Sequence, residues 1–451
     1  MEKIIFVYDV MTPWGRYPNG LNPAYLQMIW RDYDMRFDAS LDGFLKRNVC
    51  WPVYAPALNT NLSEYKSINE LRENKITEKC YYGIEPWGSI DYALGAAQED
   101  KPFTKYMSKV AKELIKSGNL YLLVNFSDDG GIWKHQLEKL RDLCNEEGFP
   151  HNKIIFVHAD FEFSKKVPDD FKIKDVYYPY SLKNKSVEIY NKTNRPDWEY
   201  WNKETHSNWN VDDYSIVTKN DFLNLLGKQR KHKGLYLNRR FRWHRIKFYK
   251  RLWEDDFLND DLSYSYDLKM FDNIEHFEQD SNFTEFIQYL KANDPKHVDV
   301  TDFNIIQGYG FEVKDTYLNT YFSIVTETMF YEDSGYISEK TWKPIAQFHP
   351  FIIFDRPGVL SKLKELGFKT FDRWWDESYD LIEDNDERFE LVYNQVKKIQ
   401  SLSHEELINM IEEMKDVLLH NNKLFLEYGQ NGNIISENVV KEIKNIVKSF
   451  I

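Results

Sequence analysis

Short apolar runs alternate along the chain with segments of helical periodicity. Residues 4–8, 120–126 and 153–158 are nearly continuous apolar runs of strand length. Residues 132–146, between the last two runs, have the spacing of an amphipathic helix that ends at Gly148. Strand, helix and strand at this spacing form a βαβ unit, which predicts a parallel sheet.

A second series of the same kind follows residues 177–218, a stretch rich in Asn, Lys, Tyr and Trp that we interpret as an irregular interdomain segment. The pattern predicts strands at residues 233–238, 321–326 and 350–354, and helices at residues 239–255, 338–347 and 358–366. A capping box from Ser403 to Glu406 predicts a helix through residue 419, and residues 434–451 form a last helix. The chain therefore has an α/β pattern with two Rossmann-like halves, whose strand ends are where a ligand is expected.

Composition narrows the class of protein. Of 451 residues, 59 are Lys or Arg and 72 are Asp or Glu, so the net charge of −13 disfavours a globally basic nucleic-acid binder. The three cysteines, Cys50, Cys80 and Cys144, are not spaced as in a metal site or a disulfide framework. Cysteines in such a pattern favour a reducing compartment. No apolar run reaches the roughly 18 residues of a membrane span, and the first run is too short for a signal peptide. We expect a cytoplasmic protein, in the host cytoplasm if its source is viral.

The densest group of chemically useful residues lies between residues 336 and 346. Ser338 can cap a helix whose first turn presents Glu339 and Lys340, and a helix N-terminus favours bound anions. Lys340 would add a full positive charge, and Glu339 could accept hydrogen bonds from a ribose diol. The competing interpretation is an ordinary capped helix with solvated charges.

This segment resembles a known signature. Glu327 and Thr328, followed by Tyr336, Ser338, Glu339 and Lys340, are similar to the donor-binding motif of α-1,3-fucosyltransferase-like glycosyltransferases of the family 10 type. Residues 349–352 and 367–371 are similar to a variant found in phage and bacterial members. The resemblance covers residues 230–425, and the N-terminal half resembles no family.

The resemblance implies a fold and site roles. The fold would be GT-B-like, with two Rossmann-like domains facing each other across a cleft: an acceptor-side domain at residues 1–215, a nucleotide-sugar donor domain at 216–425, and a C-terminal helix at 426–451 packing back on the first domain. In the family, the residue matching Glu339 contacts the nucleotide ribose and the one matching Lys340 contacts the pyrophosphate. Thr328 stands where the family usually has Asn and the spacer is about two residues longer, so the donor sugar stays open.

A basic segment follows the strand expected at residues 233–238. Arg239 or Arg240 sits where the phosphates of a cleft ligand would lie, and a guanidinium matches two phosphate oxygens. The resembled family also places a pyrophosphate-binding arginine at the start of the donor domain. Because Phe241 and Trp243 interleave with these arginines, a nucleic-acid patch is the alternative interpretation.

Candidate general bases follow strands of the first half. Asp128 and Asp129 come directly after residues 120–126, and Asp9 follows the first strand. An aspartate there could deprotonate an acceptor hydroxyl, although an Asp-Gly turn is the competing interpretation. Two D-x-D matches, at residues 32–34 and 384–386, arise by chance in so acidic a chain, and no metal cofactor is expected.

These features favour an inverting, metal-independent glycosyltransferase that uses a nucleotide sugar as co-substrate and a carbohydrate or other hydroxyl acceptor. Two alternatives stay open. One is a phage-type enzyme that glycosylates hydroxymethylated DNA bases, which the net charge does not favour. The other is a sugar-nucleotide-binding module without turnover.

Overall fold

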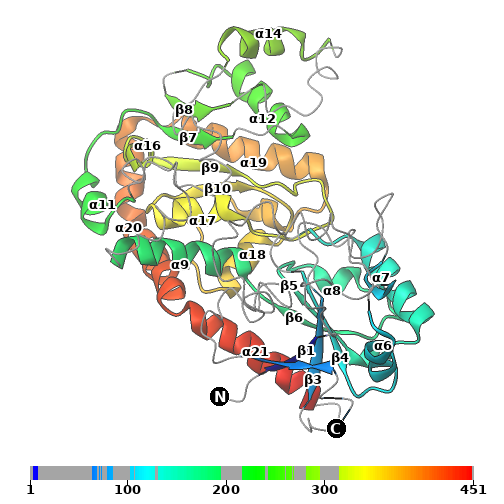
Figure 1. Ribbon diagram of the computed structural model, residues 1–451. Coiled ribbons are helices and arrows are strands. Elements are labelled where there is room, and N and C mark those ends of the chain that lie inside the picture. Colours follow the sequence, from blue (N-terminus) through cyan, green and yellow to red (C-terminus); the bar gives the residue numbers. More distant parts are fainter. Residues whose placement is uncertain are drawn as a thin grey trace. The chain divides into compact units, whose positions relative to one another are not determined.

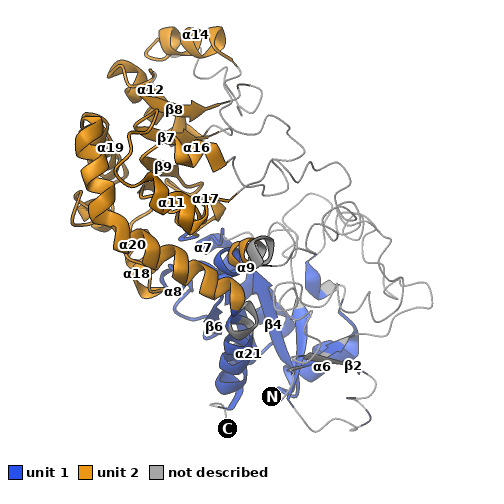
Figure 2. Cartoon of the chain, turned by 90° about the vertical axis from the view of Figure 1, so that its left-hand side faces the viewer, with its two compact units in different colours: residues 1–184, 333–336, 431–451 blue, residues 185–332, 337–430 orange. Residues whose placement is uncertain are grey.

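The computed structural model describes residues 4–8, 63–68, 71, 73, 79–84, 102–105, 107–126, 131–194, 216–238, 242–259, 261–266, 268, 281–294 and 314–448. The chain divides into two compact units (Figure 2). Unit 1 is made of Met1–Asn184, Asp333–Tyr336 and Asn431–Ile451, and unit 2 is made of Lys185–Glu332 and Ile337–Gln430.

Unit 1 is built on a parallel sheet with the strand order β2-β1-β3-β4-β5-β6. Figure 1 labels β1 and β3 to β6 of this sheet. The strands are β1 (Ile4–Tyr8), β2 (Ser63–Ser67), β3 (Cys80–Ile84), β4 (Tyr121–Phe126), β5 (Ile154–His158) and β6 (Lys174–Tyr177). Every residue of β4 and of β5 is buried, as their continuous apolar runs predict for strands covered on both faces.

Alternate residues of β4 enter two different cores. Leu122 and Val124 pack in a cluster with side chains of α6 (Lys109–Lys116) and α7 (Lys134–Glu147). Tyr121 and Leu123 pack in a second cluster with Val440 and Ile443 of the last helix, α21 (Gly432–Lys448). Because successive side chains of a strand point to opposite faces, these helices cover opposite faces of the sheet. The other short helices of the unit are η2 (Phe103–Lys105), η3 (His151–Lys153) and α8 (Phe163–Lys166).

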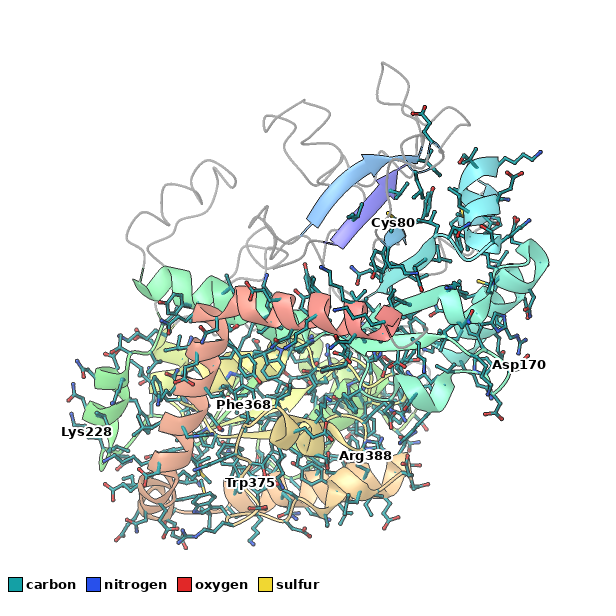
Figure 3. The ribbon with its side chains drawn as sticks, turned by 90° about the horizontal axis from the view of Figure 1, so that it is seen from below. Cys80, Asp170, Lys228, Phe368, Trp375 and Arg388 are labelled. Atoms are coloured by element: carbon teal, nitrogen blue, oxygen red, sulfur yellow. The ribbon has the colours of Figure 1, made fainter. Side chains whose placement is uncertain are left out.

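Unit 2 has a smaller parallel sheet with the order β10-β9-β7-β8. Its strands are β7 (Gly234–Leu237), β8 (Leu262–Ser265), β9 (Phe322–Thr326) and β10 (Phe351–Phe354). Its helices are α11 (Lys219–Leu225), α12 (Trp243–Glu254), α14 (Thr284–Ala292), α16 (Lys314–Leu318), α17 (Glu339–Ala346), α18 (Val359–Glu365), η6 (Ser378–Leu381), α19 (Asn385–Gln400) and α20 (His404–Gln430). Figure 3 labels Phe368, Trp375 and Arg388 among the side chains of this unit.

The predicted α/β class with two parallel, Rossmann-like sheets is confirmed. The capping box is also present, since Ser403 N donates to Glu406 Oε2 at 2.8 Å and Glu406 N donates to Ser403 Oγ at 3.2 Å. Among the helices that the structure describes, none is long and apolar enough to cross a bilayer.

The interpretation of residues 177–218 as irregular is wrong for its first part, which forms helix α9 (Tyr180–Asn194). Its periodicity is weak, but Ser186 and Ile189 are buried, and Gly429 of α20 comes so close that an added Cβ would lie 2.2 Å from Ser186 O. Tertiary contact therefore supports a helix that local pattern does not predict.

Two predicted helix bounds also need correction. Helix α20 runs to Gln430 rather than residue 419, because the polar Asn422 stays buried and donates from Nδ2 to Ala346 O at 2.8 Å. Helix α12 begins at Trp243 rather than residue 239, since Arg242 is its N-cap in extended conformation.

Candidate functional site

The strand order of unit 2 reverses beside β7. β8 pairs with one edge of β7 and β9 pairs with the other, so successive connections leave the sheet in opposite directions. Helix α12 follows β7 and helix α17 follows β9, so both begin at the carboxyl end of this sheet. In open parallel sheets, the point of reversal at this end is where ligands bind. We therefore treat the first turns of α12 and α17 as the candidate site.

Two buried basic side chains of α12 hold the end of β9. Arg245 Nη2 donates to Thr326 O at 2.8 Å, and His244 Nε2 lies 2.8 Å from Glu327 O. Burial, with the charge of Arg245 adding to it, lowers the pKa of His244 well below its usual value. His244 is therefore neutral and donates from Nε2 to the carbonyl. These contacts fix the start of α12 against the strand that leads to α17.

Glu327 organises the first turn of α17. Its side chain is buried and accepts three hydrogen bonds: from Ser338 N at 3.2 Å, from Ser338 Oγ at 2.5 Å and from Thr341 Oγ1 at 2.7 Å. The carboxylate is therefore occupied by donors of the helix start, and it fixes the position of Ser338. The sequence singled out Glu327 as a donor-binding residue, and the structure places it beneath the site.

Lys340 and Glu339 are the partly exposed charges of this turn. Lys340 Nζ donates to Ser338 Oγ and lies 3.0 Å from Glu339 Oε1. Their side chains are 29% and 25% exposed. Ser338 is the helix N-cap, and its Oγ accepts from Lys340 N at 3.3 Å. The structure thus brings Ser338, Glu339 and Lys340 together at one helix start.

The local charges keep Glu339 ionised. Burial alone would raise the pKa of its carboxyl, but the positive charges of Lys340 and Lys343 outweigh burial and lower that pKa. A carboxylate can accept two hydroxyl hydrogen bonds, and an ammonium beside a helix N-terminus favours a phosphate. The turn can therefore bind a molecule that carries both a diol and a phosphate.

Thr328 and Tyr336 are partly exposed residues of the loop between β9 and α17. The first part of that loop, up to Glu332, is tied to the rest of unit 2 by two arginines. Arg388 Nη2 donates to Phe330 O at 3.1 Å, and Arg356 Nη1 donates to Glu332 O. A loop fixed at several points presents its side chains in a defined arrangement, as binding loops on a rigid scaffold do.

A buried acid, Asp355, lies next to Glu327 at the end of β10. Burial raises the pKa of Asp355 well above its usual value, the negative charge of Glu327 adds to the effect, and nearby groups of Arg356 and Arg388 only partly oppose it. Asp355 is therefore neutral where ordinary aspartates are ionised.

Stability should fall with rising pH because of Asp355. Since its folded pKa lies above its unfolded pKa, the folded state holds more protons between the two values, and its stability declines as pH rises through that window. Asp355→Asn cannot ionise and should remove this part of the decline. The melting temperature of the variant minus that of the wild type, measured from about pH 4 to about pH 8, should grow with pH. A constant difference would show that Asp355 does not titrate this way.

Five predicted residues lie outside the described residues: Asp9, Asp128, Asp129, Arg239 and Arg240. Each comes within three residues of the carboxyl end of a described strand, β1, β4 or β7. Their roles stay predictions.

Of the two D-x-D matches, residues 32–34 also lie outside the described residues. In the other, Asp384 is the N-cap of α19 and accepts from Glu387 N at 2.8 Å. Asp386 pairs with Lys247 at 2.8 Å. In the parts of the chain that the structure describes, no group of three or more His, Cys, Asp or Glu could hold a metal ion.

Sequence reasoning missed His244, Asp355 and the buried position of Arg245. Arg245 is 3% exposed. The spacing of Arg245 from Arg242, three residues earlier, gave no sign that Arg245 is buried. The signal that could have shown it is the apolar pair Ile246 and Phe248, which places this part of α12 near the core.

The fold is that of an α/β protein, and its candidate ligand site lies at the carboxyl end of a parallel sheet. No protein-family model matches the chain, and a comparison with the curated proteins finds no match. The resemblance to α-1,3-fucosyltransferases therefore stays a hypothesis drawn from the motif.

Solved structures align with most of the chain at low identity. A glycosyltransferase from Rickettsia africae ESF-5 is 12% identical, with 98% of this chain and 100% of that chain covered and a TM-score of 0.39. T4 phage BGT in complex with its UDP-glucose substrate is 10% identical, with 99% of each chain covered and a TM-score of 0.36. Trehalose-6-phosphate synthase OtsA is 12% identical over 95% of this chain and 83% of that chain, with a TM-score of 0.36.

Proposed function

We propose that the chain is a glycosyltransferase that binds a nucleotide-sugar donor at the reversal point of the sheet in unit 2. The observation that carries the proposal is the start of α17, where Lys340 and an ionised Glu339 lie together on a helix capped by Ser338. A nucleoside diphosphate carries the ribose diol and the phosphates that these groups suit.

Each group has a separate task in this proposal. Glu339 accepts hydrogen bonds from the ribose hydroxyls, while Lys340 and the helix N-terminus face the pyrophosphate. Arg239 or Arg240 adds a second positive charge, and Thr328 and Tyr336 are the further donor-binding residues of the proposal. The resemblance of the motif to α-1,3-fucosyltransferases supports the same assignment, and the sugar itself stays open.

The reaction we propose is a single displacement with inversion. A carboxylate of unit 1, Asp128 or Asp129, takes the proton of an acceptor hydroxyl, and that oxygen attacks the anomeric carbon. The bond from this carbon to the phosphate oxygen breaks, and the nucleoside diphosphate leaves with both bonding electrons. Lys340, the arginine and the helix N-terminus stabilise the growing negative charge, so the reaction needs no metal ion.

In this proposal the acceptor is a carbohydrate or another hydroxyl compound, and the net charge does not favour a nucleic acid. The net charge of −13 repels a polyanion, so binding of DNA would need a concentrated basic groove. Transfer to hydroxymethylated DNA that weakens steeply with added salt would instead favour the DNA-modifying alternative. Binding of the donor without transfer or hydrolysis would favour a module without turnover.

Lys340→Ala should weaken binding of nucleoside diphosphates by about 10- to 150-fold, which corresponds to the roughly 1.5–3 kcal/mol of a charge-assisted hydrogen bond. Binding of the matching nucleosides should barely change, because they carry no phosphate. Calorimetric titration with a panel of nucleosides and their diphosphates measures both effects.

Lys228→Ala is the matched control. Lys228 is an exposed lysine of the same unit that follows α11, and it appears at the edge of the view in Figure 3. This variant should keep the affinities of the wild type. Equal losses of nucleoside and diphosphate binding in Lys340→Ala would show that the lysine does not contact the phosphates.

A further inference from the structure

The segment Asp333–Tyr336 belongs to unit 1, although it lies between β9 and α17 of unit 2 along the chain. The chain thus leaves unit 2 after Glu332 and returns at Ile337, one residue before the N-cap of α17. Along the chain, this segment therefore comes directly before the candidate site.

The segment is bound to residues that follow β5. Gly335 N donates to Asp160 Oδ1 at 2.9 Å, and Phe161 N donates to Gly335 O at 2.9 Å. Ser334 Oγ lies 3.3 Å from Asp160 Oδ2. Two backbone hydrogen-bonding groups of one glycine are therefore satisfied by residues about 175 positions away in the sequence.

A buried ion pair supports these bonds. Asp160 is 0% exposed and pairs with Lys166, which is 3% exposed and also donates from Nζ to Ile132 O at 2.7 Å. Asp160 Oδ1 accepts in addition from Glu162 N at 2.9 Å. A buried carboxylate is costly unless it is paired and hydrogen-bonded. Here Gly335 N and Ser334 Oγ supply two of its four donors, so release of the segment would leave the carboxylate under-satisfied.

The fit at Gly335 is close. A Cβ added there would lie 2.7–2.9 Å from three atoms of the Phe161 ring, a distance at which one group must move. Only glycine leaves room for the Phe161 ring against the backbone of residue 335 without displacement.

We propose that Asp160 and Lys166, with Phe161, Ser334 and Gly335, form a latch that positions the N-terminus of α17 and so sets the affinity of the donor site. The proposal rests on the proposed function for its ligand. Gly335 and Ser338 are three residues apart, a span of at most about 11 Å. In this proposal, a displaced segment 333–336 draws Ser338 away from Glu327, and with it Lys340, because only Tyr336 and Ile337 lie between Gly335 and Ser338.

The latch can be tested by a steric clash and its relief. Gly335→Ala should release the segment, which should speed hydrogen exchange of the amides at residues 338–341 by tenfold or more and weaken nucleoside-diphosphate binding several-fold. Phe161→Leu alone should change exchange and affinity only slightly, because it removes ring atoms and leaves the hydrogen bonds of the segment in place. The double variant should recover most of the protection and of the affinity, which a general loss of stability would not do.

Asp160→Asn gives a second line of evidence. It keeps the size of the side chain but loses the charge that pairs with Lys166, and it should also speed exchange at residues 338–341. Asp170→Asn is its control, since Asp170 is an exposed carboxylate of unit 1 that pairs with Arg141 at 3.1 Å. If Gly335→Ala does not fold, Ser334→Ala, which removes the hydrogen bond to Asp160, takes its place with a smaller increase in exchange.

The two readouts separate the latch from the proposed function. Exchange is measured without ligand, so faster exchange in Gly335→Ala that is rescued in the double variant supports the latch even if the wild type binds no nucleoside diphosphate. Unchanged exchange at residues 338–341 in Gly335→Ala, Ser334→Ala and Asp160→Asn would overturn the proposal.

Discussion

Replacing the general base by asparagine should lower kcat for sugar transfer by roughly 10²- to 10⁴-fold while leaving donor affinity nearly intact. We expect one of Asp128→Asn and Asp129→Asn to behave this way and the other to be mild. Asparagine keeps the size and most of the hydrogen bonding of aspartate but cannot take a proton. Both residues directly follow β4, an inner strand, and so come after the carboxyl end of the sheet of unit 1.

The assay needs an acceptor on which the wild type is active, with kcat and the donor dissociation constant measured separately. Asp142→Asn is the control, because Asp142 is an exposed carboxylate of the same unit, on α7, and pairs with Arg141. Near-normal kcat in both aspartate variants would show that neither Asp128 nor Asp129 is the general base. Asp9, which follows β1, would then be the next residue to test.

Arg388→Met should destabilise unit 2 by roughly 2–5 kcal/mol, the largest stability effect we expect from a single substitution. The buried guanidinium donates to Asp355 O at 3.0 Å, to Phe330 O at 3.1 Å and to Ile382 O at 2.7 Å, and it lies over the Phe330 ring. Each buried carbonyl left without a donor costs about 1–3 kcal/mol. Methionine keeps the apolar stem, so the loss comes from the hydrogen bonds.

Denaturant unfolding of the full chain, followed by a probe in unit 2, measures this change. Arg251→Met is the matched control on the neighbouring helix α12, where Arg251 is 34% exposed and pairs with Glu390 at 2.6 Å. An exposed ion pair contributes about 1 kcal/mol or less. Similar losses in the two variants would show that the carbonyl network of Arg388 adds no stability of its own.

The parts of the fold that the sequence predicted are those with strong local patterns. The continuous apolar runs of β4 and β5 and the amphipathic α7 between them are found in the structure within a few residues of the expected bounds. Ser403 and Glu406 marked the start of α20 through side-chain chemistry that acts over four residues. Such signals need no knowledge of distant residues.

Elements that depend on distant residues were missed. β6 has the sequence Lys-Asp-Val-Tyr and contains only one buried position, so nothing local identifies it as a strand beside β5. Helix α9 was missed for the same reason, because its contact with Gly429 comes from a helix more than 200 residues later.

The candidate site divides in the same way. The N-cap Ser338 and the charges of Glu339 and Lys340 follow from five consecutive residues, and the structure brings them together. The buried role of Glu327 and the contact of Gly335 with Asp160 depend on how the loop after β9 folds back and on a partner far away in the sequence. A single sequence contains no local sign of either contact.

A hydrogen-exchange footprint of a bound nucleotide sugar, measured with EDTA present, tests the central claim most directly. With the donor identified by the titration panel, saturating ligand should protect the amides at the start of α17, residues 338–343, and those at the start of α12, residues 242–246, with no metal ion available. Protection confined to other parts of the chain, or binding that is lost in EDTA and restored by Mn²⁺ or Mg²⁺, would contradict the account.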